Sequence, residues 1–225
     1  MKYSVLLFDL DQTILDTDTN AENALKKLTL PFKFDFTDKR ILHWHHTQQR
    51  MWADLELGKM TRHQLVDTRF QTYFDDFDIK VDSLALEAQF EKIFYAEHEL
   101  MPNALELLQK LQDNFQLEIV SNGTRAKQSR ILNDAHIRSL FDKMFLAEDI
   151  GYSKPDSRFF SKVISELTPF KKSEMLVIGD SLTADIQGAI DSNLDSIWFN
   201  PHHAKSDMPY TYEVNDLKEI TNILL

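Results

Sequence analysis

Five short apolar segments recur along the chain, and stretches with helical patterning lie between them. Each apolar segment is three or four residues long, which is typical of strands buried on both faces of a parallel sheet. Strands that alternate with helices in this way indicate βαβ units with right-handed crossovers. The predicted strands are Val5–Phe8, Leu117–Val120, Met144–Leu146, Met175–Ile178 and Ser196–Phe199, and the predicted helices are Pro102–Leu111, Arg125–Ala135, Arg158–Leu167 and Thr183–Asp191. The sequence therefore predicts an α/β fold with a doubly wound, Rossmann-like parallel sheet.

Between the first and second predicted strands the pattern changes to helix after helix, with no convincing strand. A long amphipathic helix comes first, and Thr61 and Asp82 are suitable N-caps for two more helices. A connection of roughly 80 residues is normally a domain rather than a loop. We therefore predict an all-helical cap domain of residues 16–98, inserted into a core domain of residues 1–15 and 99–225. Because the insertion leaves the sheet after its first strand, we expect it to cover the end of that strand.

The composition excludes several classes of protein. The net charge of −11 over 225 residues argues against a nucleic-acid or anionic-membrane partner. The absence of cysteine excludes disulfides, thiolate metal sites and cysteine nucleophiles. The first apolar segment is too short for a signal peptide, and no segment approaches the roughly 20 apolar residues of a membrane span. We expect a cytoplasmic protein with a small-molecule partner, and the sequence does not indicate an oligomeric state.

Two aspartates, Asp9 and Asp11, follow the first predicted strand directly. In extended backbone Leu10 faces the opposite way, so both carboxylates can point to one site. Two like charges about 4 Å apart repel by roughly 4 kcal/mol at an effective dielectric of about 20. Such a pair therefore requires a cation, a shared proton or a reaction.

Polar motifs also follow the later predicted strands. They are Ser121-Asn122-Gly123, Lys154-Pro155, and Gly179-Asp180-Ser181 with Asp185. Taken singly, each motif is more often an ordinary turn or helix cap. Because the carboxyl ends of parallel strands meet at one edge of a sheet, the motifs can form a single site. Carboxylates suit a hard cation such as Mg²⁺, whereas lysine, hydroxyl and backbone N–H groups suit the oxygens of a phosphate.

As a set, these motifs resemble those of the haloacid dehalogenase (HAD) superfamily of phosphatases with a helical cap. The matching stretches are Asp9-Leu10-Asp11-Gln12-Thr13, Ser121-Asn122-Gly123, Lys154-Pro155, and Gly179-Asp180-Ser181 with Asp185. Gln12 is a departure, because this superfamily most often has glycine there. Within the superfamily the chain is similar to pyrimidine 5′-nucleotidases. The stretches that carry this closer similarity are Trp52-Ala53-Asp54-Leu55-Glu56-Leu57-Gly58-Lys59, Arg69-Phe70, Ser121-Asn122-Gly123, Trp198-Phe199-Asn200 and His202-His203.

The resemblance implies a function and a role for each motif. Asp9 is the expected nucleophile, which forms an aspartyl-phosphate, and Asp11 the expected general acid and base. The expected cofactor is Mg²⁺, bound by Asp9, the main-chain carbonyl of Asp11, and Asp180. The phosphoryl group is expected to contact Ser121, Asn122, Gly123 and Lys154, while Thr13 and Asp185 orient these groups. The expected reaction is hydrolysis of a phosphomonoester, with a pyrimidine nucleoside monophosphate as substrate.

Several alternatives stay open at this point. A sugar-phosphate phosphatase or a phosphomutase of the same superfamily would use the same groups. A phospho-aspartate signalling or binding protein would also combine acids, a hydroxyl and a lysine, but the long insertion after Asp11 argues against it. Dehalogenases of the superfamily lack an aspartate at the position of Asp11, because a leaving halide needs no proton. The presence of Asp11 therefore favours phosphoryl transfer.

Overall fold

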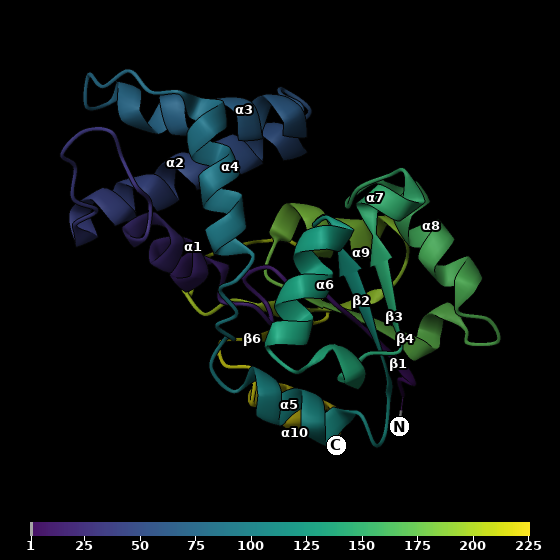
Figure 1. Cartoon of the computed structure of the whole chain (residues 1–225). Helices are drawn as coiled ribbons and strands as arrows, with labels where there is room; N and C mark the ends of the chain where they lie inside the picture. Colours follow the sequence, from purple (N-terminus) through teal and green to yellow (C-terminus); the bar gives the residue numbers. More distant parts are fainter. Residues whose placement is uncertain (1) are drawn as a thin grey trace. The chain divides into compact units, whose positions relative to one another are not determined.

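The computed structural model describes residues 2–225, with Glu56 described by its backbone only, and its elements form two compact units (Figure 1). The first unit, here called the α/β unit, comprises the residues up to Thr17 together with His98–Leu225. The second, here called the helical unit, comprises Asp18–Glu97.

The α/β unit is built on a six-stranded sheet in which every pairing is parallel, in the order β3-β2-β1-β4-β5-β6. The strands are β1 (Val5–Phe8), β2 (Gln116–Ser121), β3 (Lys143–Leu146), β4 (Met175–Gly179), β5 (Asp195–Phe199) and β6 (Tyr212–Val214). Strand β1 lies between β2 and β4, and all its residues are paired on both sides. The predicted fold class is confirmed. The edge strand β6 was not predicted, because Glu213 separates its two apolar residues and the segment shows no apolar run.

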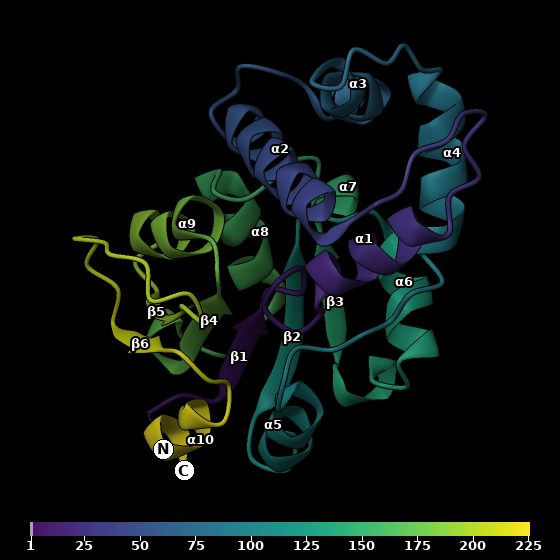
Figure 2. The ribbon, with the colours of Figure 1, turned by 90° about the vertical axis from the view of Figure 1, so that its left-hand side faces the viewer.

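Helices cover both faces of this sheet (Figure 2). The α-helices of the unit are α5 (Ala104–Leu111), α6 (Arg125–Asp134), α7 (Ala147–Ile150), α8 (Ser157–Glu166), α9 (Gln187–Asp191) and α10 (Glu219–Leu224). Successive side chains of β1 alternate between the faces. Leu6 and Phe8 pack in one apolar cluster with residues of α5, α6 and α10, whereas Val5 and Leu7 pack in another with residues of α8 and α9.

The segment after β4 differs from the single helix predicted over Thr183–Asp191. A π-helical turn, η3 (Leu182–Ile186), comes first and leads into α9. Ser181 caps this turn, because its hydroxyl accepts the backbone N–H of Ala184 at 3.0 Å. Single π-helical turns are frequent at functional sites, and this one carries Asp185. Two short 3₁₀ turns, η1 (Arg138–Leu140) and η2 (Lys172–Glu174), precede β3 and β4.

The helical unit contains the rest of α1 (Thr17–Lys26), with α2 (Asp38–Glu56), α3 (Arg62–Asp75) and α4 (Ser83–Phe94). Both predicted N-caps are confirmed: Thr61 forms a capping box with Gln64, and Asp82 accepts the N–H of Ala85 at 3.0 Å. An aromatic core that includes Trp44, Phe70, Tyr73, Phe74 and Phe90 holds the helices together. None of the helices formed by residues 2–225 has both the length and the apolar composition needed to cross a bilayer.

Candidate active site

Lys154 is the centre of a buried polar cluster at the carboxyl ends of the strands. Its side chain is 1% exposed, and Nζ donates to Asp9 Oδ1 at 2.7 Å, Asp185 Oδ1 at 2.6 Å and the carbonyl of Val120 at 2.8 Å. An ammonium group has three donors, so these contacts use all of them. Asp9 comes directly after β1, and Asp185 lies in η3 after β4. The structure thus brings three separate chain segments together around one cation.

Burial strongly perturbs the acids of this cluster. It raises the pKa of Asp9 to about 7, because the attraction of Lys154 is opposed by Asp185 and Asp11. Burial also raises the pKa of Asp180 well above its ordinary value, with Asp9 and Asp185 adding to the effect. For Lys154 burial alone would lower the pKa, but Asp185 and Asp9 outweigh it and raise the pKa. Three acids share this cluster with one lysine, so the repulsion among them adds to burial in raising the pKa values of Asp9 and Asp180.

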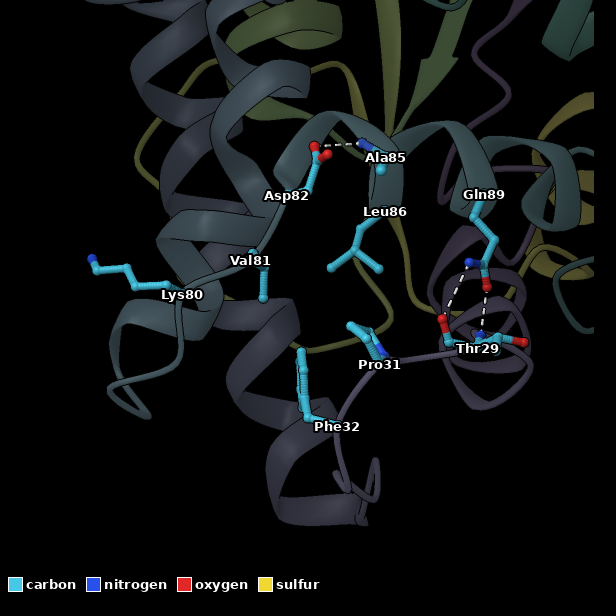
Figure 3. Close-up of a pocket in the computed structure, with 9 residues that line it drawn as sticks. All are labelled: Thr29, Pro31, Phe32, Lys80, Val81, Asp82, Ala85, Leu86 and Gln89. Atoms are coloured by element: carbon cyan, nitrogen blue, oxygen red, sulfur yellow. Dashed lines mark hydrogen bonds between the residues drawn. The ribbon is translucent and has the colours of Figure 1, made fainter.

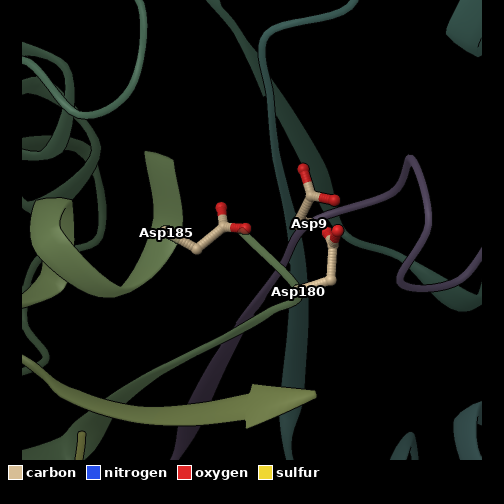
Figure 4. A group of neighbouring side chains, drawn as sticks. All are labelled: Asp9, Asp180 and Asp185. Carbon is tan, nitrogen blue, oxygen red and sulfur yellow. The ribbon is translucent and has the colours of Figure 1, made fainter. Parts of the chain in front are cut away.

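This donor set fits a divalent cation. Carboxylate oxygens of Asp9, Asp180 and Asp185 lie within 4.8 Å of one another and converge in Figure 4. Both oxygens of Asp185 are engaged, by Lys154 and by the N–H of Ser181 at 3.1 Å. Within residues 2–225, Asp9 and Asp180 each keep one oxygen outside any hydrogen bond. Asp9 and Asp180 therefore fit as ligands, and Asp185 fits as a residue that holds Lys154.

Gly179 and Thr13 help to position Asp185 and Asp180, respectively. A Cβ at Gly179 would lie 2.3 Å from Cγ of Asp185, so only glycine allows this approach. The hydroxyl of Thr13 donates to Asp180 Oδ1 and accepts the N–H of Asp180, both at 3.1 Å. The indole N–H of Trp198 donates to the carbonyl of Asp180 at 2.9 Å. Trp198 lies in a stretch that the sequence comparison singled out, but this contact was not predicted.

The residues Ser121-Asn122-Gly123 form hydrogen bonds with one another and with the backbone of Lys154. The hydroxyl of Ser121 accepts the N–H of Gly123 at 3.0 Å. The side chain of Asn122 brackets the backbone of Lys154, donating to its carbonyl at 3.0 Å and accepting its N–H at 2.8 Å. Asn122 thus ties this loop to the loop that carries the lysine, and the phosphate contacts expected of these residues remain predictions.

Asp11 is not one of the three converging carboxylates, and side chains of helix α6 hold it. Lys127 Nζ contacts its Oδ1 at 2.5 Å, and Gln128 Nε2 donates to its Oδ2 at 2.8 Å. Sequence reasoning missed both partners. A signal was present, because Thr124 caps α6 and the next three or four residues must lie in the first turn, beside the preceding loop.

The helical unit also contains Arg69, one of the residues that carry the similarity to pyrimidine 5′-nucleotidases. Arg69 forms a bidentate pair with Glu87 at 2.5 Å, and its guanidinium lies 4.7 Å from the centre of the Phe90 ring. The two charged side chains are 11% and 8% exposed. This pair joins α3 to α4, and both Glu87 oxygens accept hydrogen bonds from the guanidinium of Arg69.

A pocket of about 210 Å³ lies within the helical unit (Figure 3). Several of its polar groups already have partners. The amide of Gln89 is bonded to the N–H and carbonyl of Thr29, Asp82 caps α4, and Lys80 pairs with Asp75. The pocket does not resemble the charged cluster of the α/β unit.

The order of these motifs along the chain and their meeting point define a known class. The family model of haloacid dehalogenase-like hydrolases matches residues 6–199. The chain therefore belongs to this family of enzymes, and the predicted family and enzyme class are confirmed.

Individual relatives cover almost the whole chain. It is 35% identical to the HAD-hydrolase YfnB of Bacillus subtilis, over 99% of this chain and 96% of that protein. The crystal structure of YfnB bound to magnesium matches with a TM-score of 0.91 and 33% identity, over 100% of this chain and 99% of that one. The pyrimidine 5′-nucleotidase PynA of Streptococcus pneumoniae is 33% identical, over 100% of this chain and 96% of that protein. The pyrimidine 5′-nucleotidase YjjG of Escherichia coli is 26% identical, over 100% of this chain and 99% of that protein.

Proposed function

We propose that this enzyme is a Mg²⁺-dependent phosphomonoester hydrolase that acts through an aspartyl-phosphate on Asp9. The observation that carries this proposal is the buried carboxylate of Asp9, held by Lys154 among an excess of acids, with Asp11 supported separately by α6. Two relatives that align over the whole chain are named pyrimidine 5′-nucleotidases. They support pyrimidine nucleoside 5′-monophosphates as the substrates.

In the first step a carboxylate oxygen of Asp9 attacks phosphorus, and the bond from phosphorus to the leaving oxygen breaks. Lys154 fixes the direction of the attacking carboxylate through the 2.7 Å contact with Oδ1. Mg²⁺, bound by Asp9, Asp180 and the main-chain carbonyl of Asp11, would offset the repulsion between carboxylates and phosphate. The hydroxyl of Ser121 would donate to a phosphoryl oxygen.

Asp11 moves the protons in both steps. It donates a proton to the leaving alcohol oxygen as the phosphoenzyme forms, and it then accepts a proton from the water that hydrolyses the phosphoenzyme. Lys127 and Gln128 hold its two oxygens, so the carboxylate has a defined direction. This division of labour needs two acids on separate supports, which Asp9 and Asp11 have.

A phosphate-release screen with Mg²⁺ over nucleoside monophosphates and sugar phosphates tests the proposal. We expect the highest kcat/KM for pyrimidine nucleoside 5′-monophosphates. A sugar phosphate as the best substrate would overturn the substrate assignment but keep the chemistry. Isomerisation of a sugar phosphate without phosphate release would identify a phosphomutase, and no reaction with any phosphomonoester would overturn the proposal altogether.

A further inference from the structure

Gln128 connects two groups to which the proposed function gives different roles. It lies in the first turn of α6 and is fully buried. Its Nε2 donates to Asp11 Oδ2 at 2.8 Å and to the hydroxyl of Ser121 at 3.0 Å. An amide nitrogen has two hydrogens, and a carboxylate can only accept. The contact with Asp11 therefore fixes which way the amide points.

This contact also restricts what the hydroxyl of Ser121 can do. The oxygen accepts one N–H from Gly123 and one from Gln128, both at 3.0 Å. A serine hydroxyl has two lone pairs and one hydrogen, so both lone pairs are occupied. What remains is the O–H donor, which suits an anion such as a phosphoryl oxygen.

The loop is shaped around this glutamine. A Cβ at Gly123 would lie 2.2 Å from Nε2 of Gln128, so the glycine makes room for the amide. The carbonyl oxygen of Gln128 is buried without a hydrogen-bond partner among residues 2–225. Leaving such an acceptor unpaired is unfavourable. The penalty falls on the oxygen of the amide, whereas its nitrogen makes both the contact with Asp11 and the contact with Ser121.

From these contacts we propose that Gln128 is a positioning residue for the reaction. Its amide aligns the carboxylate that transfers protons and, at the same time, commits the hydroxyl of Ser121 to donating toward phosphate. The inference rests on the proposed function, because that function assigns proton transfer to Asp11 and phosphate binding to Ser121. Without Gln128, Asp11 would keep the contact with the long and flexible side chain of Lys127.

The test compares two substrates on Gln128→Met, which keeps a similar side-chain length without donors. One is uridine 5′-monophosphate, whose leaving alcohol needs a proton, and the other is p-nitrophenyl phosphate, whose leaving group is stable as an anion. We expect kcat/KM to fall about 100-fold for the nucleotide and less than about 10-fold for p-nitrophenyl phosphate. Because both are measured on one preparation, the ratio does not depend on the fraction of folded enzyme.

Ile131→Val is the matched control, because it loosens the packing of the same helix without removing a polar contact. It should leave the ratio of the two kcat/KM values unchanged. If Gln128→Met does not fold, Gln128→Asn, whose amide is too short to reach both partners, should shift the ratio in the same direction. An unchanged ratio in the folded Gln128 variants would overturn the inference. Failure of the proposed function would instead show in the wild type, as no turnover of either substrate.

Discussion

The two units of this protein contrast in how they treat buried charge. In the helical unit Arg69 and Glu87 form a bidentate pair, one positive charge against one negative. In the α/β unit Lys154 faces a cluster to which Asp9, Asp180 and Asp185 all contribute. In the matched pair the two charges offset each other, so the pair joins two helices without needing a bound ion or ligand. An excess of buried acids is unfavourable unless a bound group offsets it, so it marks a place of chemistry.

The largest effect should come from removing the excess charge at Asp9. We expect Asp9→Asn to lower kcat/KM for every phosphomonoester by at least ~10⁴-fold, because the amide is not a nucleophile. The unfolding temperature without Mg²⁺ should stay the same or rise, since repulsion among the acids falls. Asp75→Asn, at an exposed carboxylate of the helical unit, is the control and should remain fully active. Near-wild-type hydrolysis by Asp9→Asn would rule out its role as the nucleophile.

Withdrawal of the divalent cation should have the next largest effect. We expect excess EDTA to lower turnover by about 10³-fold and Mg²⁺ to restore it, because the acids repel an anionic substrate without the cation. Thermal unfolding gives an independent measure: Mg²⁺ should raise the unfolding temperature of the wild type more than that of Asp180→Asn. Full activity in EDTA would contradict the assignment of the cluster as a metal site.

Breaking the pair of the helical unit should give the opposite pattern, a loss of stability with chemistry retained. Glu87→Gln leaves the charge of Arg69 buried and unpaired, and we expect the free energy of unfolding to fall by about 3 kcal/mol. The double variant Arg69→Met with Glu87→Leu should recover much of this loss. Urea denaturation measures both, while kcat/KM for p-nitrophenyl phosphate should stay within about threefold. A large loss of that activity in folded Glu87→Gln would end the contrast between the units.

The smallest effect concerns the backbone of the turn that separates Asp9 from Thr13. Gln12 has a φ of +65°, in the left-handed region that non-glycine residues avoid by about 1–2 kcal/mol. Glycine loses about 0.5–1 kcal/mol more in chain entropy, so Gln12→Gly should stabilise the protein by less than about 1 kcal/mol. Asp78→Gly in the helical unit, at a φ of +56°, is the matched control with a smaller expected gain. Equal gains in urea denaturation would show that the site holds no extra strain.

The sequence predicted the sheet and the acids because both signals are local. Short apolar segments mark the strands, and Asp9 and Asp180 follow β1 and β4 directly. The supports of Asp11 were missed, because Lys127 and Gln128 are 116 and 117 residues away along the chain. Their role depends on where α6 begins relative to another strand. The bracket that Asn122 forms around the backbone of Lys154 could not be predicted for the same reason.

The central place of β1 in the sheet has a consequence for how this enzyme opens and loses activity on heating. The backbone N–H of Asp9 donates a hydrogen bond to the carbonyl of Ile178 at 2.9 Å. Strand β1 is paired along its whole length with β2 on one side and β4 on the other. Opening at Asp9 therefore requires rupture of the middle of the sheet, so its amide hydrogen should exchange with solvent only through global opening. Heat inactivation and collapse of the sheet should accordingly share one rate.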